Sequence, residues 1–364
     1  MTLSDVLSGD SAWCALHGDV LDRLREMPDE SVNCIVTSPP YWGLRDYGIE
    51  GQIGLEATLG EYIEKMVTVF REARRVLRGD GTCWMNLGDL YASQPSWGRA
   101  DHTSTLEGRK HSEMPFALKD ERGRRTRGAL GGLKPKDMVG LPWRLAFALQ
   151  ADGWYLRSDI IWHKSNPMPE SAEDRPTRSH EYLFLLAKSS RYRYDADAIK
   201  EPVTGGAHAR APMKKPAGWE TGGGGHGASH RDGRENGVSG VTPKSATPGP
   251  GNRIKANSSF HAATVGLVTK RNKRTVWTIA TEGFTEAHFA TFPTALVEPC
   301  VLAGCPIGGI VLDCFSGSGT TGVVALRHGR RYIGIEINSE YVEMSRRRIV
   351  GDSPMFNATS AAAS

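Results

Sequence analysis

The chain has 364 residues, of which 39% are hydrophobic and 24% are charged, which is ordinary for a globular protein. That length predicts one large α/β domain with a smaller module. No apolar run is long enough to span a bilayer, and we see no signal peptide at the N-terminus, so we expect a cytoplasmic protein.

The net charge is only +4, but positive charge is concentrated in the middle of the chain. Residues 200–274 contain 13 Lys and Arg but only 4 Asp and Glu, and the remainder is slightly acidic. A basic module on a near-neutral body suits a polyanion-binding attachment. A solvated, disordered basic insertion explains the charge equally well.

The six cysteines are scattered, and no pair has zinc-finger spacing with matching histidines. We therefore expect buried free thiols, no disulfide framework and no metal site.

The first part of the chain has an α/β pattern. We expect a short helix at Asp22–Met27, a buried strand at Val32–Val36 that Ser-Pro-Pro ends, a helix at Glu61–Leu77 and a strand at Thr82–Leu87. Gly79-Asp80-Gly81 would separate the last two. The polar stretch Tyr91–Lys136 predicts a long, partly mobile loop.

A regular hydrophobic pattern resumes at Met138–Arg144, and we expect a helix that ends at Gln150. Strands are expected at Trp154–Trp162 and Glu181–Ala187. Residues 201–259 are low-complexity sequence that cannot bury a core, so we expect flexibility without a ligand. A helix is expected at Pro293–Ala303.

The last part is a βαβ unit. It comprises a strand at Gly309–Asp313, a Gly-rich turn, a helix at Gly322–His328, a strand at Arg331–Glu336 and a helix at Ser339–Ile349. This order predicts a nucleoside site in which Glu336 accepts hydrogen bonds from ribose hydroxyls. The turn is neither Gly-x-Gly-x-x-Gly nor a P-loop, which favours a cofactor without a pyrophosphate. A purely structural turn remains the alternative.

Asp-Cys-Phe-Ser-Gly-Ser-Gly-Thr-Thr at 313–321 resembles motif I of the DNA amino-methyltransferases, with Cys314 in place of the usual proline. The resemblance implies S-adenosyl-L-methionine as cofactor, with the glycines and Asp313 facing its methionine end. Segment 288–293 resembles the part that closes over the cofactor, and Asp19 resembles the acid that contacts adenine. The implied cofactor residues are Asp19, Thr37, Phe292, Pro293, Asp313, Phe315, Ser316, Gly317, Ser318, Gly319, Thr320, Thr321, Glu336 and Asn338.

Thr37-Ser38-Pro39-Pro40-Tyr41 resembles the same family's [DNS]-P-P-[YFW] motif, so the implied catalytic residues are Ser38, Pro39, Pro40 and Tyr41. An exocyclic amino group is a poor nucleophile because its lone pair is delocalised into the ring. The Ser38 oxygen and the Pro39 carbonyl can both accept hydrogen bonds from the amino hydrogens, and the fixed φ of the proline presets the direction of the carbonyl. Tyr41 can stack on a flipped base. A Ser-Pro-Pro turn with buried aromatics is the structural alternative, and Cys300 is interpreted as packing.

The order of the motifs is that of the permuted beta group. The resemblance therefore implies a Rossmann-like class I methyltransferase fold, α/β with a mixed seven-stranded sheet. We expect a catalytic half at 1–194 with a basic insertion at 93–136, a target-recognition region at 195–275, a cofactor-binding half at 276–350 and a disordered tail at 351–364. Recognition is assigned to 195–275, with help from 95–135, and should depend steeply on salt.

Central blocks also resemble that group and are expected to line the base pocket and the DNA cleft. They are Leu141–Arg144, Gly153-Trp154, Ile161–Lys164, Asn166–Glu170, Asp174-Arg175 and His180–Tyr182. The DNA-contact candidates are Trp42, Arg45, Lys164, Arg175, Arg178, Lys270, Arg271 and Arg274, with surface charge as the alternative. The implied partner is double-stranded DNA, for a monomer or homodimer encoded by a bacterium or phage, associated with the nucleoid and part of a restriction-modification system.

Serine at the first motif position usually accompanies N4-cytosine methylation in this family, which makes cytosine the expected target and N6-adenine the alternative. Related enzymes act on RNA or protein amides, and a non-catalytic DNA-binding module could keep the fold. The basic module and the motif order favour DNA, and the filled cofactor positions favour an enzyme.

Overall fold

The computed structural model describes residues 1–43, 48–92, 132–134, 136–203, 270–282 and 292–352. It divides into two compact units, one made of residues 1–199 with 273–364 and the other of residues 200–272. Arg45, most of the 93–136 insertion, most of the 195–275 region and residues 353–364 therefore lie outside the described residues.

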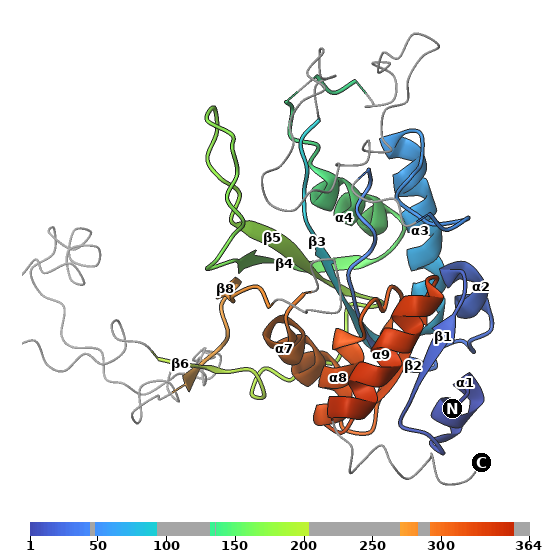
Figure 1. Ribbon diagram of the computed structural model, residues 1–364. Coiled ribbons are helices and arrows are strands. Elements are labelled where there is room, and N and C mark those ends of the chain that lie inside the picture. The colour runs from blue at the N-terminus through green and yellow to red at the C-terminus, as the bar shows by residue number, and fades with distance from the viewer. Residues whose placement is uncertain (44–47, 93–131, 135, 204–269, 283–291, 353–364) are drawn as a thin grey trace, which may run out of the picture. The chain divides into compact units, whose positions relative to one another are not determined.

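One sheet organises the larger unit (Figure 1), and within the described residues its order is β1-β10-β9-β2-β3-β5-β4-β8. Strands β1, β10, β9, β2 and β3 pair in parallel, β5 pairs antiparallel with β3 and β4, and β8 pairs in parallel with β4. The strands are β1 (Trp13–His17), β2 (Val32–Thr37), β3 (Leu77–Leu87), β4 (Tyr155–His163), β5 (His180–Ala187), β8 (Val276–Thr278), β9 (Ile310–Asp313) and β10 (Arg331–Glu336).

Helices cover both faces of this sheet. Side chains alternate between faces along a strand, so Ile35 and Leu312 belong to one buried cluster while Cys34 and Val311 belong to the other. The first cluster takes residues from α1 (Leu3–Ser8), α2 (Val20–Arg25), α3 (Leu59–Val76) and α4 (Leu141–Ala151), and the second from α7 (Thr294–Gly304), α8 (Thr320–Arg327) and α9 (Ser339–Asp352). The architecture is the three-layer α/β arrangement expected from the sequence.

Local sequence explains the longest helix, α3. Thr58 and Glu61 form a reciprocal capping box at its first turn. Tyr62, Met66 and Phe70 recur at helical spacing on its buried face, where each contributes about 1.5–3 kcal/mol. The Tyr62 hydroxyl donates to the Pro40 carbonyl at 2.7 Å, so this helix also holds the turn that follows β2.

The observed sheet differs from the expectation in detail. Counted over the described residues, it has eight strands rather than seven because β8, three residues long, adds to the edge beside β4. Strand β3 starts at Leu77, directly after α3, so Gly79-Asp80-Gly81 is part of the strand instead of a turn. A Cβ on Gly81 would lie 2.5 Å from Leu77, so close packing explains this glycine. Helix α1 and strand β1 were not predicted.

The smaller unit contributes one described antiparallel pair, β6 (Glu201–Pro202) with β7 (Lys270–Arg271). The Arg271 Nε donates to Glu201 Oε1 at 2.8 Å, which closes the two ends of the unit. A target-recognition role for this region remains a prediction.

Two distant segments meet at the middle of the sheet. Cys34 and Ile35 of β2 pair in parallel with Val311 and Leu312 of β9. The turns that follow these strands therefore emerge at the same edge, which is where open parallel sheets bind ligands.

Candidate functional site

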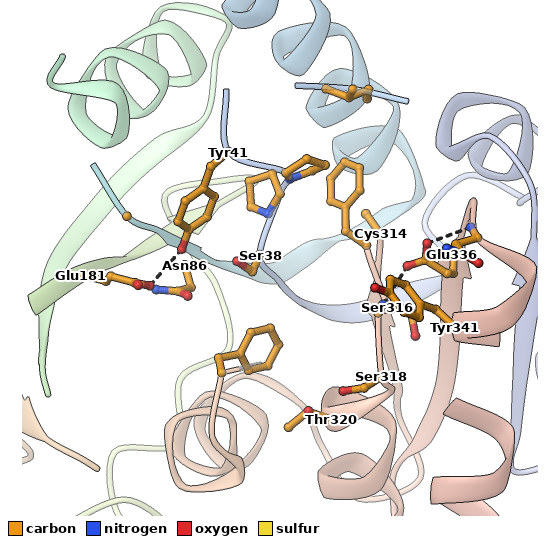
Figure 2. A pocket seen from close by; sticks show the side chains of 18 of the residues that line it. Ser38, Tyr41, Asn86, Glu181, Cys314, Ser316, Ser318, Thr320, Glu336 and Tyr341 are labelled. Carbon is orange, nitrogen blue, oxygen red and sulfur yellow. Dashed lines mark hydrogen bonds between the residues drawn. The ribbon is translucent and has the colours of Figure 1, made fainter. Parts of the chain in front are cut away.

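The turn after β2 lines a cavity of about 770 Å³, and Ser38, Pro39, Pro40 and Tyr41 all contribute to its wall. Figure 2 shows Ser38 and Tyr41 on one side of this cavity and Ser316, Ser318 and Glu336 on the other. One cavity therefore joins the two motifs identified in the sequence.

The Tyr41 phenol is held by charged neighbours. Its hydroxyl donates to Glu181 Oε2 at 2.9 Å, and Glu181 Oε1 accepts from Lys164 Nζ at 2.5 Å. The ammonium also lies 4.7 Å from the centre of the Trp162 ring. Burial, followed by the Glu181 charge, raises the pKa of Tyr41 well above its usual value, so the phenol stays protonated.

Trp42 differs from the predicted DNA contact. Its side chain is 2% exposed within the core, and its indole Nε1 donates to the Glu56 carbonyl at 3.0 Å. A buried ring has no surface to offer DNA, so this tryptophan packs the base of the turn.

The turn after β9 requires glycine at two positions. Gly317 and Gly319 have φ values of 50° and 76°, in the left-handed region that side chains disfavour. A Cβ on Gly319 would also lie 2.8 Å from that of Ser345 in α9. The turn delivers Ser316, Ser318 and Thr320 to the cavity wall.

Asp313 lies beneath this turn and is fully buried. Thr37 Oγ1 donates to its Oδ1 and Thr321 Oγ1 to its Oδ2, each at 2.7 Å, and the Phe315 N–H donates to Oδ1 at 3.0 Å. Burial raises the pKa of Asp313 to about 6, although these hydrogen bonds oppose the shift. Asp313 thus links the end of β9 to the end of β2 and does not face the cavity.

Glu336, at the end of β10, does line the cavity. Its Oε2 accepts from the Gly317 N–H at 2.8 Å and its Oε1 from the Asn338 N–H at 2.9 Å (Figure 2). Burial raises its pKa. The backbone amides orient a carboxylate whose remaining lone pairs can accept from hydroxyl donors in the cavity.

Among the predicted cofactor residues, nine line the cavity: Asp19, Phe292, Phe315, Ser316, Gly317, Ser318, Thr320, Glu336 and Asn338. The others, Thr37, Pro293, Asp313, Gly319 and Thr321, do not line it. Asp19 caps α2 by accepting from the Leu21 and Asp22 N–H groups. Asp313 makes all its described hydrogen bonds within the protein core, and the expectation that it faces the cofactor remains a prediction.

The predicted DNA-contact cations near the cavity are paired with acids. Arg175 lies 2.5 Å from Glu170 and 3.9 Å from the centre of the Tyr91 ring. Arg178 lies 3.3 Å from Asp89, while its buried Nη1 has no hydrogen-bond partner among the described residues.

The remaining candidates lie elsewhere. Lys270 and Arg271 belong to the smaller unit. The backbone carbonyl of Arg274 accepts a hydrogen bond from Trp277 Nε1 at 2.6 Å. Arg45 lies outside the described residues.

The central blocks are divided between cavity and core. Trp162, Lys164, His180 and Glu181 line the cavity, as do Asn166, Pro167, Met168 and Glu170. Leu141–Arg144 and Gly153-Trp154 belong instead to helix α4 and its end.

Asn86 is a cavity residue that the sequence analysis missed. It is 4% exposed, and its Nδ2 donates to the Tyr182 carbonyl at 3.1 Å. An amide near the carboxyl end of an otherwise apolar strand was the available signal. Tyr341 and Met344 of α9 were missed for another reason, because only packing brings that helix to the cavity.

The six cysteines are free and buried, as expected, and Cys300 is an interior residue of α7. Within the described ranges, no cluster of His, Cys, Asp and Glu has the geometry of a metal site. Nor does any described helix combine the length and apolar character that a membrane crossing needs.

Comparison with known proteins identifies close relatives. The N6_N4_Mtase family model, described as DNA methylase, matches residues 32–347. The Type II methyltransferase M.Cfr9I of Citrobacter freundii is 44% identical over 336 residues, covering 92% of this chain and 87% of that protein. M.SmaI of Serratia marcescens is 42% identical, covering 92% and 89%.

Solved structures share the fold. PvuII DNA methyltransferase, described as cytosine-N4-specific, has a TM-score of 0.55 at 16% identity and covers 96% of this chain and 93% of its own. A DNA modification methylase structure from Thermus thermophilus, complexed with S-adenosyl-L-methionine, has a TM-score of 0.50 at 21% identity, covering 95% and 98%. These likenesses show a class I methyltransferase fold.

Proposed function

The chain belongs to the N6/N4 DNA methylase family, whose members methylate DNA from S-adenosyl-L-methionine, and we propose that it modifies the exocyclic N4 amino group of cytosine in a duplex. The observation that carries the proposal is that Ser38 and Pro39 line the same cavity as the turn after β9, on the side that faces it.

The cavity residues fit the cofactor. Glu336 offers carboxylate oxygens to ribose hydroxyls, Phe292 and Phe315 offer apolar rings, and the turn at Gly317 leaves space where a side chain would otherwise stand. Bound S-adenosyl-L-methionine supplies an electrophilic methyl group on a sulfonium. The protein's part is to hold the amino group in line with that methyl and to exclude water.

Ser38 and Pro39 would activate the amino group. Their oxygens accept hydrogen bonds from its two N–H groups, which favours a pyramidal nitrogen with an available lone pair. The fixed φ of proline limits the directions open to the Pro39 carbonyl, so the acceptors are preorganised. Tyr41 presents its ring to the cavity, where it can stack on a base turned out of the duplex.

Serine at the first motif position supports cytosine over adenine. Duplex DNA without methylation should be incubated with the protein and the cofactor, digested to nucleosides and analysed by mass spectrometry. We expect N4-methylcytosine. N6-methyladenine without N4-methylcytosine would contradict the choice of base, and methylation of RNA or protein in preference to DNA would contradict the substrate class.

We assign sequence recognition to residues 195–275, with help from 95–135, where most residues lie outside the described ranges. The excess of Lys and Arg between 200 and 274 supports contact with phosphates. Binding to duplex DNA should weaken steeply as salt rises, and deletion of 204–269 should abolish site selection. Unchanged site selection by that variant would place recognition elsewhere.

A further inference from the structure

A guanidinium on helix α9 contacts the turn that follows β9. Arg348 Nη1 donates to Ser318 Oγ and to Thr320 Oγ1, each at 2.8 Å, and lies 3.4 Å from the Ser318 carbonyl oxygen. Ser318 and Thr320 both line the cavity, whereas Arg348 does not. Arg348 therefore contacts two cavity residues without being one itself.

These contacts fix the direction of both hydrogen bonds. A guanidinium can only donate, so each hydroxyl oxygen accepts from Nη1, which has one hydrogen for each. Each hydroxyl keeps its own hydrogen to donate, and within the described residues neither hydroxyl has another hydrogen-bond partner. Ser318 and Thr320 are only 6% and 3% exposed. Because a buried donor without an acceptor is unfavourable, the two hydrogens indicate a ligand with acceptor atoms on the cavity side.

The surroundings of the two hydroxyls favour an anion. Helix α8 begins at Thr320, and its first turn has neither a side-chain cap nor an acidic residue. The N–H groups of a first helical turn lack partners within the helix and attract negative charge. Burial lowers the pKa of Arg348, but an arginine keeps its positive charge at neutral pH. A fixed cation and a helix start thus act on the same side of the cavity.

The cavity has a different character at Glu336. That carboxylate offers acceptors, and Figure 2 shows Ser318 and Thr320 apart from it. Glu282 also lines the cavity, but its oxygens accept from the Thr294 N–H and hydroxyl, each at 3.2 Å. S-adenosyl-L-methionine has one carboxylate, and its ribose hydroxyls can donate. The acceptors of Glu336 suit the ribose, and the donors of Ser318 and Thr320 suit the carboxylate.

We propose that Arg348 is a positioning residue that holds the Ser318 and Thr320 hydroxyls as hydrogen-bond donors to the carboxylate of S-adenosyl-L-methionine. The inference rests on the cofactor of the proposed function, but not on which base is methylated. Loss of Arg348 leaves each hydroxyl free to turn, and removes a positive charge that attracts the carboxylate.

The test measures two ligands by titration calorimetry in the absence of DNA. They are S-adenosyl-L-methionine and decarboxylated S-adenosylmethionine, which lacks only the carboxylate and should bind the wild type more weakly. Arg348→Met should raise the Kd of S-adenosyl-L-methionine by about tenfold and that of the decarboxylated ligand by less than about twofold. Equal weakening of both ligands would indicate a purely structural role. That result, or two unchanged Kd values, would overturn the proposal.

Arg346→Met is the matched control on the same helix. Arg346 pairs with Glu343 at 3.0 Å and donates to the Ala15 carbonyl at 3.3 Å, and none of these residues lines the cavity. Both Kd values should stay at their wild-type levels in this variant. A rise in the Kd of S-adenosyl-L-methionine as large as in Arg348→Met would contradict a specific role for Arg348.

The route through the hydroxyls is tested by combining variants. Ser318→Ala with Thr320→Val removes both hydroxyls and should weaken S-adenosyl-L-methionine selectively. Adding Arg348→Met to that pair should weaken it little further, because the arginine acts through the groups already removed. Losses that multiply would contradict this route.

Unfolding and a wrong function are distinguishable outcomes. If Arg348→Met lowers the melting temperature, Arg348→Gln keeps a polar group in place but removes the charge and the fixed direction. The ratio of the two Kd values should then fall toward one, and an unchanged ratio in the folded variant would overturn the proposal. A wild type that binds the cofactor but methylates no DNA would contradict the proposed function alone.

Discussion

The turns after β2 and β9 lie at the same edge of the sheet, but they are held differently. The turn after β9 is anchored by Asp313, whose carboxylate is fully buried and bound to Thr37, Thr321 and a backbone N–H. The turn after β2 presents Ser38 and Tyr41 to the cavity, where Glu181, itself in a partly exposed ion pair with Lys164, accepts a hydrogen bond from the Tyr41 hydroxyl. Because the acid beneath the turn after β9 is fully buried, we expect changes there to affect the stability of the fold, and changes at Ser38 or Tyr41 to affect stability less.

Ser38→Ala should give the largest effect and should separate activity from stability. Removing one preorganised acceptor is expected to lower kcat by about 100- to 1000-fold. Because Ser38 lies on the cavity wall, the melting temperature and the affinity for S-adenosyl-L-methionine should stay close to wild type. Methyl-transfer assays and calorimetry measure both. A variant that loses cofactor affinity along with activity would remove the distinction between the two turns.

The pH dependence of stability should identify Asp313 as part of the core. Its folded pKa of about 6 lies above its ordinary value of 3.8, so the folded state binds its proton more tightly. The protonated Asp313 therefore contributes to the stability of the folded state. The contribution is fully present below pH 3.8 and is lost as pH rises through about 6. The shift corresponds to about 3 kcal/mol.

Urea unfolding of wild type and Asp313→Asn at matched pH values isolates that contribution, because other groups titrate in both proteins. The stability of wild type relative to the variant should increase as pH falls from 7 to 4. A constant difference across this range would mean that Asp313 is ionised in both states or lies in contact with water.

Thr321→Val tests the same network without removing the acid. The two side chains have similar shapes, so the main change is the loss of the hydroxyl that donates to Asp313 Oδ2 at 2.7 Å. We expect a loss of about 2 kcal/mol in the free energy of unfolding. Thr68→Val is the matched control, since Thr68 donates only to the Glu64 carbonyl on the exposed face of α3. Equal small losses in both would show that the buried bond contributes little.

Glu336→Gln should have the smallest effect and should act on the ligand. The amide places a donor where the carboxylate offered an acceptor to the ribose hydroxyls. Binding of S-adenosyl-L-methionine should therefore weaken, with a Kd about tenfold higher. Titration calorimetry measures the affinity directly. An unchanged Kd would exclude Glu336 from cofactor binding. Its main role would then be to hold the backbone at Gly317 and Asn338 through its two hydrogen bonds.

Much of the fold could be predicted from sequence because periodicity and turn residues are local signals. Strand β2, helix α3 and the unit from β9 to α9 were found within two or three residues of their observed bounds. Helix α1 and strand β1 are short, at six and five residues, and carry too little periodicity to stand out. Strand β8 exists through pairing with β4, which no local pattern records.

Only part of the site could be predicted, because motifs identify residues but not the contacts that folding creates between distant segments. Motifs located Ser38 and Glu336, whose side chains face the cavity. They could not show that Asp313 faces away, because its orientation depends on Thr37, which lies far from it in sequence. Nor could they connect Tyr41 with Glu181, since that contact exists only when β3 and β5 pair.

The contact between Thr37 and Asp313 spans 276 residues. Synthesis proceeds from the N-terminus, so the catalytic turn leaves the ribosome long before its buried anchor exists. Contacts of such high sequence separation form late and slowly. A nascent or truncated chain that lacks β9 (Ile310–Asp313) therefore has no complete centre, and we expect it to have no methyltransferase activity until β9 has been made.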